Sequence, residues 1–146
     1  MSSAVLTSVP DAAARLVVDT DVASFIFKWH PEFAPRYLRI VRGFPLFISF
    51  MTVAEMRQGA LAANRGSRKL NLLDAYLADF SVLDSSSLLC SKWAGLRDES
   101  ERKGRPIRVA DGWVAASAVV LNAPLVTNNP SDYQHLDGLQ LVAAVQ

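Results

Sequence analysis

Acidic side chains that could hold a metal ion stand at three separate places in the chain, Asp19, Glu55 and Asp111. Carboxylates gathered in one pocket repel one another, so such a cluster persists only when protons or cations neutralise it. Hard oxygen ligands, with no cysteine and few histidines beside them, select Mg²⁺ or Mn²⁺. A metal held in this way orients a phosphate and activates a water molecule. These residues therefore predict phosphodiester hydrolysis.

Each of these acids also has a purely structural explanation. Asp19 follows an apolar run and could form a turn, while Asp111, near the start of a predicted helix, could simply complement the helix dipole. Glu55 stands three residues after Thr52, which has the form of a capping box. Asp21 could be the N-cap of the following helix. We favour metal ligation for the three acids because a parallel sheet would bring them to one edge.

The apolar pattern predicts strands and helices in alternation. Alternation of this kind implies an α/β fold, with a mostly parallel sheet of four to five strands covered by helices on both faces. Residues 1–14 are expected to be a loose leader, and residues 15–146 a single domain. Strands are expected at 15–18, 46–48, 82–83, 125–127 and 139–142, and helices from 22, across 37–41, from 52, and over 67–79, 85–103 and 109–121.

Polar residues follow several of the predicted strands directly. Asp19 follows the first strand, Ser49 the second, and Thr127 and Asn129 a later one. In open parallel sheets, ligands bind just beyond the carboxyl ends of the strands. We therefore expect these side chains to share one site.

The charge of the chain is nearly balanced overall but uneven along the sequence. The net charge is +1, which argues against a strongly basic nucleic-acid binder. Between Arg36 and Lys69, however, Glu55 is the single acid among seven basic residues, so this stretch predicts a locally positive face. The lone cysteine favours the reducing cytoplasm, and no apolar stretch is long enough to cross a membrane.

Four stretches of the sequence together resemble the PIN-domain ribonucleases, and among them the VapC-like toxins of bacterial toxin–antitoxin pairs. The order and spacing of the stretches match the family over nearly the whole chain. They are residues 16–22, 48–59, 104–116 and 125–133.

The resemblance implies a three-layer α/β/α fold and an endoribonuclease that uses Mg²⁺, or Mn²⁺ in its place. In that family, Asp19, Glu55 and Asp111 would be the acidic triad that holds the metal, and Thr20 and Ser49 would be supporting polar residues. It also implies a cognate antitoxin as partner, a homodimer, contact with DNA only through the antitoxin, and inhibition of translation. The family pattern itself does not name the RNA.

This sequence departs from the family pattern at two positions. Asn129 stands where many relatives have a fourth acid, and Asp21 stands where asparagine is usual. Asp132, further along the same loop, could partly compensate, beside Thr127 at its start. The departures leave open whether one or two metals bind.

Two other readings compete with a nuclease. A phosphatase of the haloacid-dehalogenase type would use Asp19 as a covalent nucleophile, but it needs a downstream lysine, and the last lysine is Lys103. A degenerate PIN domain would only bind a partner. If RNA is the substrate, Arg57, Arg65 and Arg68 are expected to hold its phosphates.

Overall fold

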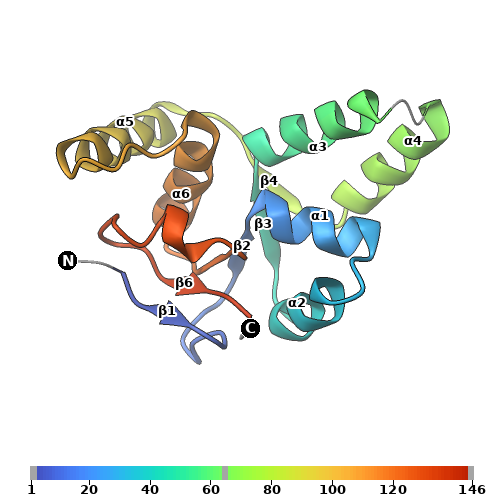
Figure 1. Cartoon of the computed structure of the whole chain (residues 1–146), viewed down its shortest axis with the longest axis horizontal. Helices are drawn as coiled ribbons and strands as arrows, with labels where there is room; N and C mark the ends of the chain where they lie inside the picture. The colour runs from blue at the N-terminus through green and yellow to red at the C-terminus, as the bar shows by residue number, and fades with distance from the viewer. Residues whose placement is uncertain (1–2, 64–65, 145–146) are drawn as a thin grey trace.

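The computed structural model describes residues 3–63 and 66–144. Within these two ranges, no helix is both long enough and apolar enough to cross a lipid bilayer. The ribbon shows a central sheet between two groups of helices (Figure 1). The predicted α/β class and the three-layer arrangement are therefore confirmed.

In the described part of the chain, the sheet has six parallel strands in the order β1-β6-β5-β2-β3-β4. The prediction of four to five strands missed β1. Residues 1–14 were expected to be a loose leader, but Val5 and Leu6 pair with Leu141 and Val142. The strands are β1 (Val5–Leu6), β2 (Leu16–Val18), β3 (Leu46–Ser49), β4 (Ser81–Leu83), β5 (Leu125–Val126) and β6 (Leu141–Val142).

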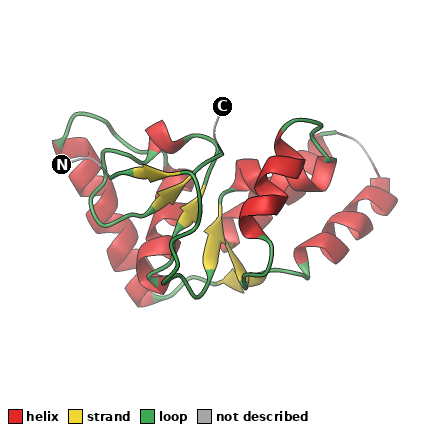
Figure 2. Ribbon diagram, turned by 90° about the horizontal axis from the view of Figure 1, so that it is seen from below, coloured by secondary structure: helices red, strands yellow, loops and turns green. Residues whose placement is uncertain are grey.

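The helices divide into two groups, one on each face of the sheet (Figures 1 and 2). Helices α5 and α6 lie on one side, and α1 to α4 lie on the other. The predicted range 109–121 coincides with α6. The bounds are α1 (Thr20–Lys28), α2 (Phe33–Val41), α3 (Phe50–Ala62), α4 (Gly66–Leu77), α5 (Ser87–Arg102) and α6 (Val109–Leu121), with a short 3₁₀ turn, η1 (Pro130–Asp132).

The central strand β2 is buried on both faces, which explains its unbroken apolar run. Leu16 and Val18 point into the core beneath α1 to α4, while Val17 points into the core beneath α5 and α6. All three side chains are fully buried. Successive side chains of a strand alternate between the two faces, so this one strand joins both cores.

Strand β2 is also where the chain changes direction across the sheet. From β2 the chain builds outward through β3 to β4, then returns to place β5 and β6 on the other side of β2. In open α/β sheets, the loops at such a switch point diverge and leave a crevice at the carboxyl ends of the strands. The loops after β2 and β5 therefore border the expected site.

The start of α6 is fixed by a close approach to α5. The indole of Trp93 stacks on Trp113, with ring centroids 4.9 Å apart, and its Nε1 donates to the Val109 carbonyl at 3.2 Å. Trp93 also lies over Gly112, where an added Cβ would come within 2.8 Å of the indole Nε1. Only glycine leaves room for this packing.

We expect Gly112→Ala to destabilise the protein by about 1–3 kcal/mol, because the new methyl group must push Trp93 out of its place. Chemical denaturation of the purified variant measures this change. Gly95→Ala is the matched control, since Gly95 lies on α5 with nothing within 4 Å of an added Cβ. There we expect no loss, because alanine favours the helix. Equal stability of Gly112→Ala and the wild type would contradict the steric explanation.

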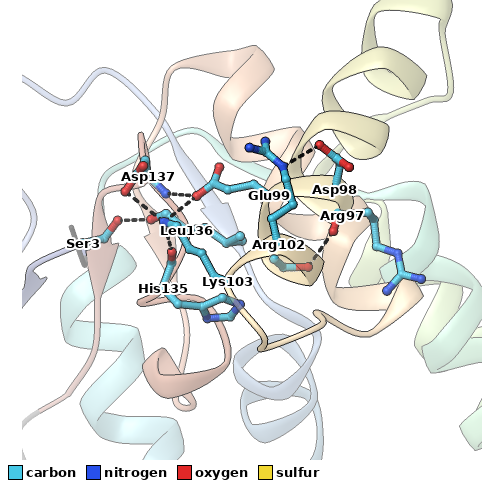
Figure 3. A network of polar contacts seen from close by, with 10 residues as sticks. Ser3, Arg97, Asp98, Glu99, Arg102, Lys103, His135, Leu136 and Asp137 are labelled. Carbon is cyan, nitrogen blue, oxygen red and sulfur yellow. Dashed lines mark hydrogen bonds and ion pairs between the residues drawn. The ribbon is translucent and has the colours of Figure 1, made fainter.

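A polar network ties the end of α5 to the loop that precedes β6 (Figure 3). The Lys103 Nζ donates to the His135 carbonyl at 2.5 Å and to Glu99 Oε2 at 2.9 Å. The Ser3 hydroxyl, from the N-terminal segment, donates to the Leu136 carbonyl of the same loop at 2.5 Å. This loop is therefore held from two sides.

Candidate active site

Asp19 is the most deeply buried acid of the site, with 7% of its surface exposed. It follows β2 and caps α1, because its Oδ1 accepts the Thr20 backbone N–H at 2.7 Å. Its Oδ2 accepts the hydroxyls of Thr127 at 2.8 Å and Tyr133 at 3.0 Å. Burial, and then the nearby charge of Asp21, raise the pKa of Asp19 to about 7. The fold thus holds this carboxylate in place although its charge is costly there.

Asp21 joins the start of α1 to the loop after β5. Its Oδ1 accepts the Val22 backbone N–H at 2.6 Å, while its Oδ2 accepts the Asn128 backbone N–H and the Asn129 Nδ2, both at 3.0 Å. Burial raises its pKa to about 6. The alternative that Asp21 is the N-cap is wrong, because Asp19 caps the helix. Asn129 thus acts as a donor to an acid.

Glu55 is linked to the same centre through Thr20. The Thr20 hydroxyl donates to Glu55 Oε1 at 2.9 Å and lies 2.8 Å from the hydroxyl of Thr52. The expected capping box at Thr52 is wrong. Helix α3 begins two residues earlier, and its N-cap is Ser49, whose hydroxyl accepts the Met51 backbone N–H at 3.1 Å. Thr52 instead faces the site from inside the helix.

Asp111 lies in the first turn of α6, where the helix dipole favours a carboxylate. Its pKa is raised, mainly by burial and further by the charges of Asp132 and Glu55. The Arg108 guanidinium and the Tyr133 hydroxyl act in the opposite direction. The charges of Glu55 and Asp132 are thus close enough to Asp111 to affect it.

The loop after β2, helix α3, the start of α6 and the loop after β5 bring these carboxylates together. The carboxylates do not form a closed cage. In the ranges 3–63 and 66–144, no three histidine, cysteine or acidic side chains converge on one point closely enough to bind a metal by themselves. Mg²⁺ usually binds through one or two carboxylates and keeps several waters. Burial, and after it the nearby carboxylates, raise the pKa values of Asp19 and Asp111, so a cation would favour their ionised forms, and their donors are hard oxygens. The residues therefore fit a hydrated divalent cation.

Tyr133 is a site residue that the sequence reasoning missed. Its ring is fully buried, and its hydroxyl bonds Asp19 and lies near enough to Asp111 to lower the pKa of that acid. A buried tyrosine needs a polar partner for its hydroxyl. That requirement, together with its place in the loop that carries Thr127 and Asn129, was the available signal. The Tyr133 hydroxyl thus donates to Asp19 and lies close to Asp111.

The predicted phosphate-binding arginines do not all point to the site. Arg57 lies 3.4 Å from Asp74 in an exposed ion pair, and Arg68 is exposed on α4. Arg65 lies outside the described residues. A groove of about 320 Å³ runs from Glu55 between α1, α3 and α4, and its cations are Lys28 and Lys69. A role for the three arginines in holding RNA stays a prediction.

Comparison with known proteins gives a consistent family. A family model described as PIN domain matches residues 16–139. Ribonuclease VapC1 of Haemophilus influenzae strain R2866 is 27% identical over 125 residues, which are 85% of this chain and 93% of that protein. The tRNA(fMet)-specific endonuclease VapC of Shigella flexneri is 25% identical over 126 residues, 86% of this chain and 95% of that protein.

The fold has a close counterpart among solved structures. A chain in the crystal structure of VapBC2 from Rickettsia felis, bound to a DNA fragment from their promoter, superposes with a TM-score of 0.78. It is 25% identical, and the match covers 89% of this chain and 98% of that one. Residues 1–15 precede the matched family model, so β1 lies outside it.

Proposed function

This chain belongs to the PIN-domain family, and on that premise we propose that it is a divalent-metal-dependent endoribonuclease, the toxin of a toxin–antitoxin pair, with Asp19, Glu55 and Asp111 at its active centre. The observation that carries the proposal is the buried carboxylate of Asp19 at the switch point of the sheet. Thr20 bonds both Asp19 and Glu55, and Tyr133, which donates to Asp19, lies close to Asp111. Relatives named as ribonucleases support it.

Asp19 and Asp111 would hold Mg²⁺, and Glu55 would complete the centre through water or directly. The bound cation would supply Lewis-acid stabilisation of the phosphate and would make a bound water easier to deprotonate. The chain itself supplies orientation. The Thr127 and Tyr133 hydroxyls and the Thr20 backbone N–H fix the carboxylate of Asp19 from three sides. Fixed ligands of this kind cost no reorganisation during the reaction.

Glu55 would orient the attacking water. The Thr20 hydroxyl holds one of its oxygens, and the residue is only half buried, at the end of a groove open to solvent. A carboxylate in that position can hold a water next to a bound phosphate and accept its proton. Lys28 and Lys69, further along the groove, would attract the RNA backbone.

The partners follow from the relatives. VapBC complexes have been solved from Rickettsia felis and Haemophilus influenzae, the former with promoter DNA. We propose that this chain likewise binds a cognate antitoxin, which places a basic side chain in or beside the acidic centre. The complex would contact DNA only through the antitoxin. We also propose a homodimer and a cytoplasmic location, where the RNA substrate is made. Transfer RNA is the first substrate to test, because one relative is named for it.

The phosphatase alternative finds no support in the site. That class needs a lysine downstream in the chain, and the last lysine here is Lys103. The strand that precedes the later loop, β5, leads to Asn128 and Asn129 rather than to an acid pair.

Cleavage mapping on total bacterial RNA and on purified transfer RNA tests the proposed function. We expect the wild type with Mg²⁺ to give discrete cleavage sites, and Asp111→Ala to lose them, since removal of a metal ligand removes several kcal/mol of transition-state stabilisation, or about 10³-fold in rate. Absence of cleavage by the wild type in both samples would favour a domain that only binds a partner. Labelling of Asp19 by a phosphate donor would favour the phosphatase.

A further inference from the structure

Three side chains form a line of hydrogen bonds from inside helix α3 to the proposed metal centre. The Thr20 hydroxyl donates to Glu55 Oε1 at 2.9 Å, and its oxygen lies 2.8 Å from the oxygen of the Thr52 hydroxyl. Thr20 comes from the start of α1, whereas Thr52 and Glu55 lie about one turn apart on α3. We call this arrangement the hydroxyl chain, Thr52–Thr20–Glu55. The proposed function gives its first member, Thr52, no role.

The direction of the two hydrogen bonds follows from the protons available. A threonine hydroxyl has one proton to donate, and an ionised carboxylate can only accept. Because Thr20 donates its proton to Glu55, it must accept from Thr52. Thr52 therefore donates to Thr20, which in turn donates to Glu55. Hydrogen bonds in such a chain polarise one another, so the bond to Glu55 depends on both hydroxyls.

The hydroxyl of Thr52 is costly at its position. The residue lies inside α3 and is 0% exposed, and valine would have nearly the same shape there without a polar group. A buried hydroxyl costs free energy unless it is hydrogen-bonded. In the part of the chain that the structure describes, the partner of this hydroxyl is Thr20. The polar atom of Thr52 thus serves the neighbouring helix α1 and, through it, Glu55.

Glu55 is held at one oxygen and open at the other. Its Oε1 accepts the Thr20 hydroxyl, while its Oε2 accepts no hydrogen bond from residues 3–63 or 66–144. The side chain is half-buried and borders the groove of about 320 Å³ between α1, α3 and α4. A carboxylate fixed through one oxygen presents the second in a defined direction. That second oxygen is available to a water next to a bound phosphate.

We propose that Thr52 is a positioning residue for RNA hydrolysis, which acts through the Thr20 hydroxyl to fix Glu55 and so present its free oxygen to the attacking water. The inference rests on the proposed function and adds to it a residue that is buried away from the substrate. Thr20 serves two acids at once, because its backbone N–H donates to Asp19 at 2.7 Å. A base held in this way needs no reorganisation during the reaction.

Thermal unfolding in EDTA tests the hydroxyl chain without metal or RNA. Thr20→Val should lower the melting temperature by about 5 °C, because it leaves the Thr52 hydroxyl buried without a partner. Addition of Thr52→Val should then raise the melting temperature again, since the unpartnered hydroxyl is gone. In the wild-type background, Thr52→Val should instead lower it by about 2 °C. A decrease of the same size in both backgrounds would overturn the hydroxyl chain.

Cleavage kinetics test the positioning role itself. Thr52→Val should lower kcat by about 10-fold, the effect of one lost hydrogen bond, with KM for RNA within about 2-fold of the wild type. Thr52→Ser, which keeps the hydroxyl, should restore kcat to within about 2-fold. In the Thr20→Val background, Thr52→Val should have no further effect on kcat, because it acts through Thr20. Thr7→Val, which removes an exposed hydroxyl next to β1, three strands from β2, is the matched control.

The outcomes separate this inference from the proposed function. Cleavage by the wild type with an unchanged kcat in Thr52→Val would overturn the positioning role and leave the nuclease intact. An equal loss of kcat in Thr52→Ser and Thr52→Val, or a further loss when Thr52→Val is added to Thr20→Val, would assign the effect to packing and also overturn the role. A wild type that cuts no RNA, with the two opposite shifts in melting temperature, would refute the proposed function while the hydroxyl chain stands.

Discussion

Asp19→Asn should abolish RNA cleavage and at the same time make the metal-free protein more stable. Loss of a charged metal ligand removes several kcal/mol of transition-state stabilisation, so we expect a fall in kcat/KM of about 10³-fold or more. The stability should rise because the carboxylate is buried and carries a pKa of about 7. At pH 7.5 the folded protein must keep a charge there that burial and Asp21 disfavour.

The amide can replace the carboxylate without a change of shape. Its oxygen can still accept the Thr20 backbone N–H, and the hydroxyls of Thr127 and Tyr133 can turn to accept its N–H groups. We expect a gain of about 1–3 kcal/mol in the free energy of unfolding at pH 7.5 in EDTA. Asp98→Asn is the matched control, because Asp98 lies on the surface of α5 in an exposed pair with Arg102. It should leave activity unchanged and stability within about 0.5 kcal/mol.

The two results together distinguish a functional acid from a structural one. A residue that only supported the fold would lower stability when replaced, and its loss of activity would follow the loss of folded protein. A variant that is more stable and inactive has lost chemistry alone. Retention of more than about a tenth of the wild-type kcat/KM would remove Asp19 from the active centre.

Acidification should stabilise the wild-type protein in EDTA, which is the reverse of the usual behaviour of aspartates. The folded pKa of Asp19, about 7, lies above its value of 3.8 in the unfolded chain. Between these values the folded state retains a proton that the unfolded state has lost, so this group costs stability progressively as the pH rises from about 4 to about 7. Asp21, with a pKa of about 6, acts in the same direction.

Mg²⁺ should reverse this dependence, because a cation favours the ionised carboxylates. We expect the increase in melting temperature on addition of Mg²⁺ to be large at pH 8 and to vanish near pH 5. His135 opposes the effect in EDTA, since its lowered pKa costs stability as the pH falls below 6.5. The difference between wild type and Asp19→Asn at each pH cancels that contribution. A difference that is constant between pH 5 and 8 would falsify the raised pKa.

The fold followed from the sequence wherever an element carries its own pattern. Strand β2 is an unbroken apolar run, and α6 an alanine-rich stretch, and both were placed within a residue. Strand β1 was missed because its two residues have no pattern of their own. They are a strand only because β6, more than 130 residues later, offers an unpaired edge. The start of α3 was misplaced because Thr52 and Ser49 are both good caps, and packing decides between them.

The three acids were predicted from the sequence together with Thr20 and Thr127, and the structure brings these residues together, whereas Tyr133 was not predicted. Asp19, Glu55 and Asp111 could be proposed because they are acidic residues that follow a predicted strand or lie in a predicted helix near the same edge of the sheet. The bonds of Tyr133 and Thr20 to those acids depend on how four segments meet, which no local spacing encodes. Long-range contacts of this kind are settled by the tertiary packing.

The two carboxylates that would share one cation come from positions 19 and 111, and the hydroxyl that bonds the first and lies close to the second comes from position 133. During synthesis on the ribosome, the first hundred residues would therefore emerge without half of the centre. A growing chain of this protein could not cleave RNA at the ribosome until its translation is almost complete. The order of the segments thus gives the cell a delay in which a neutralising partner can be ready.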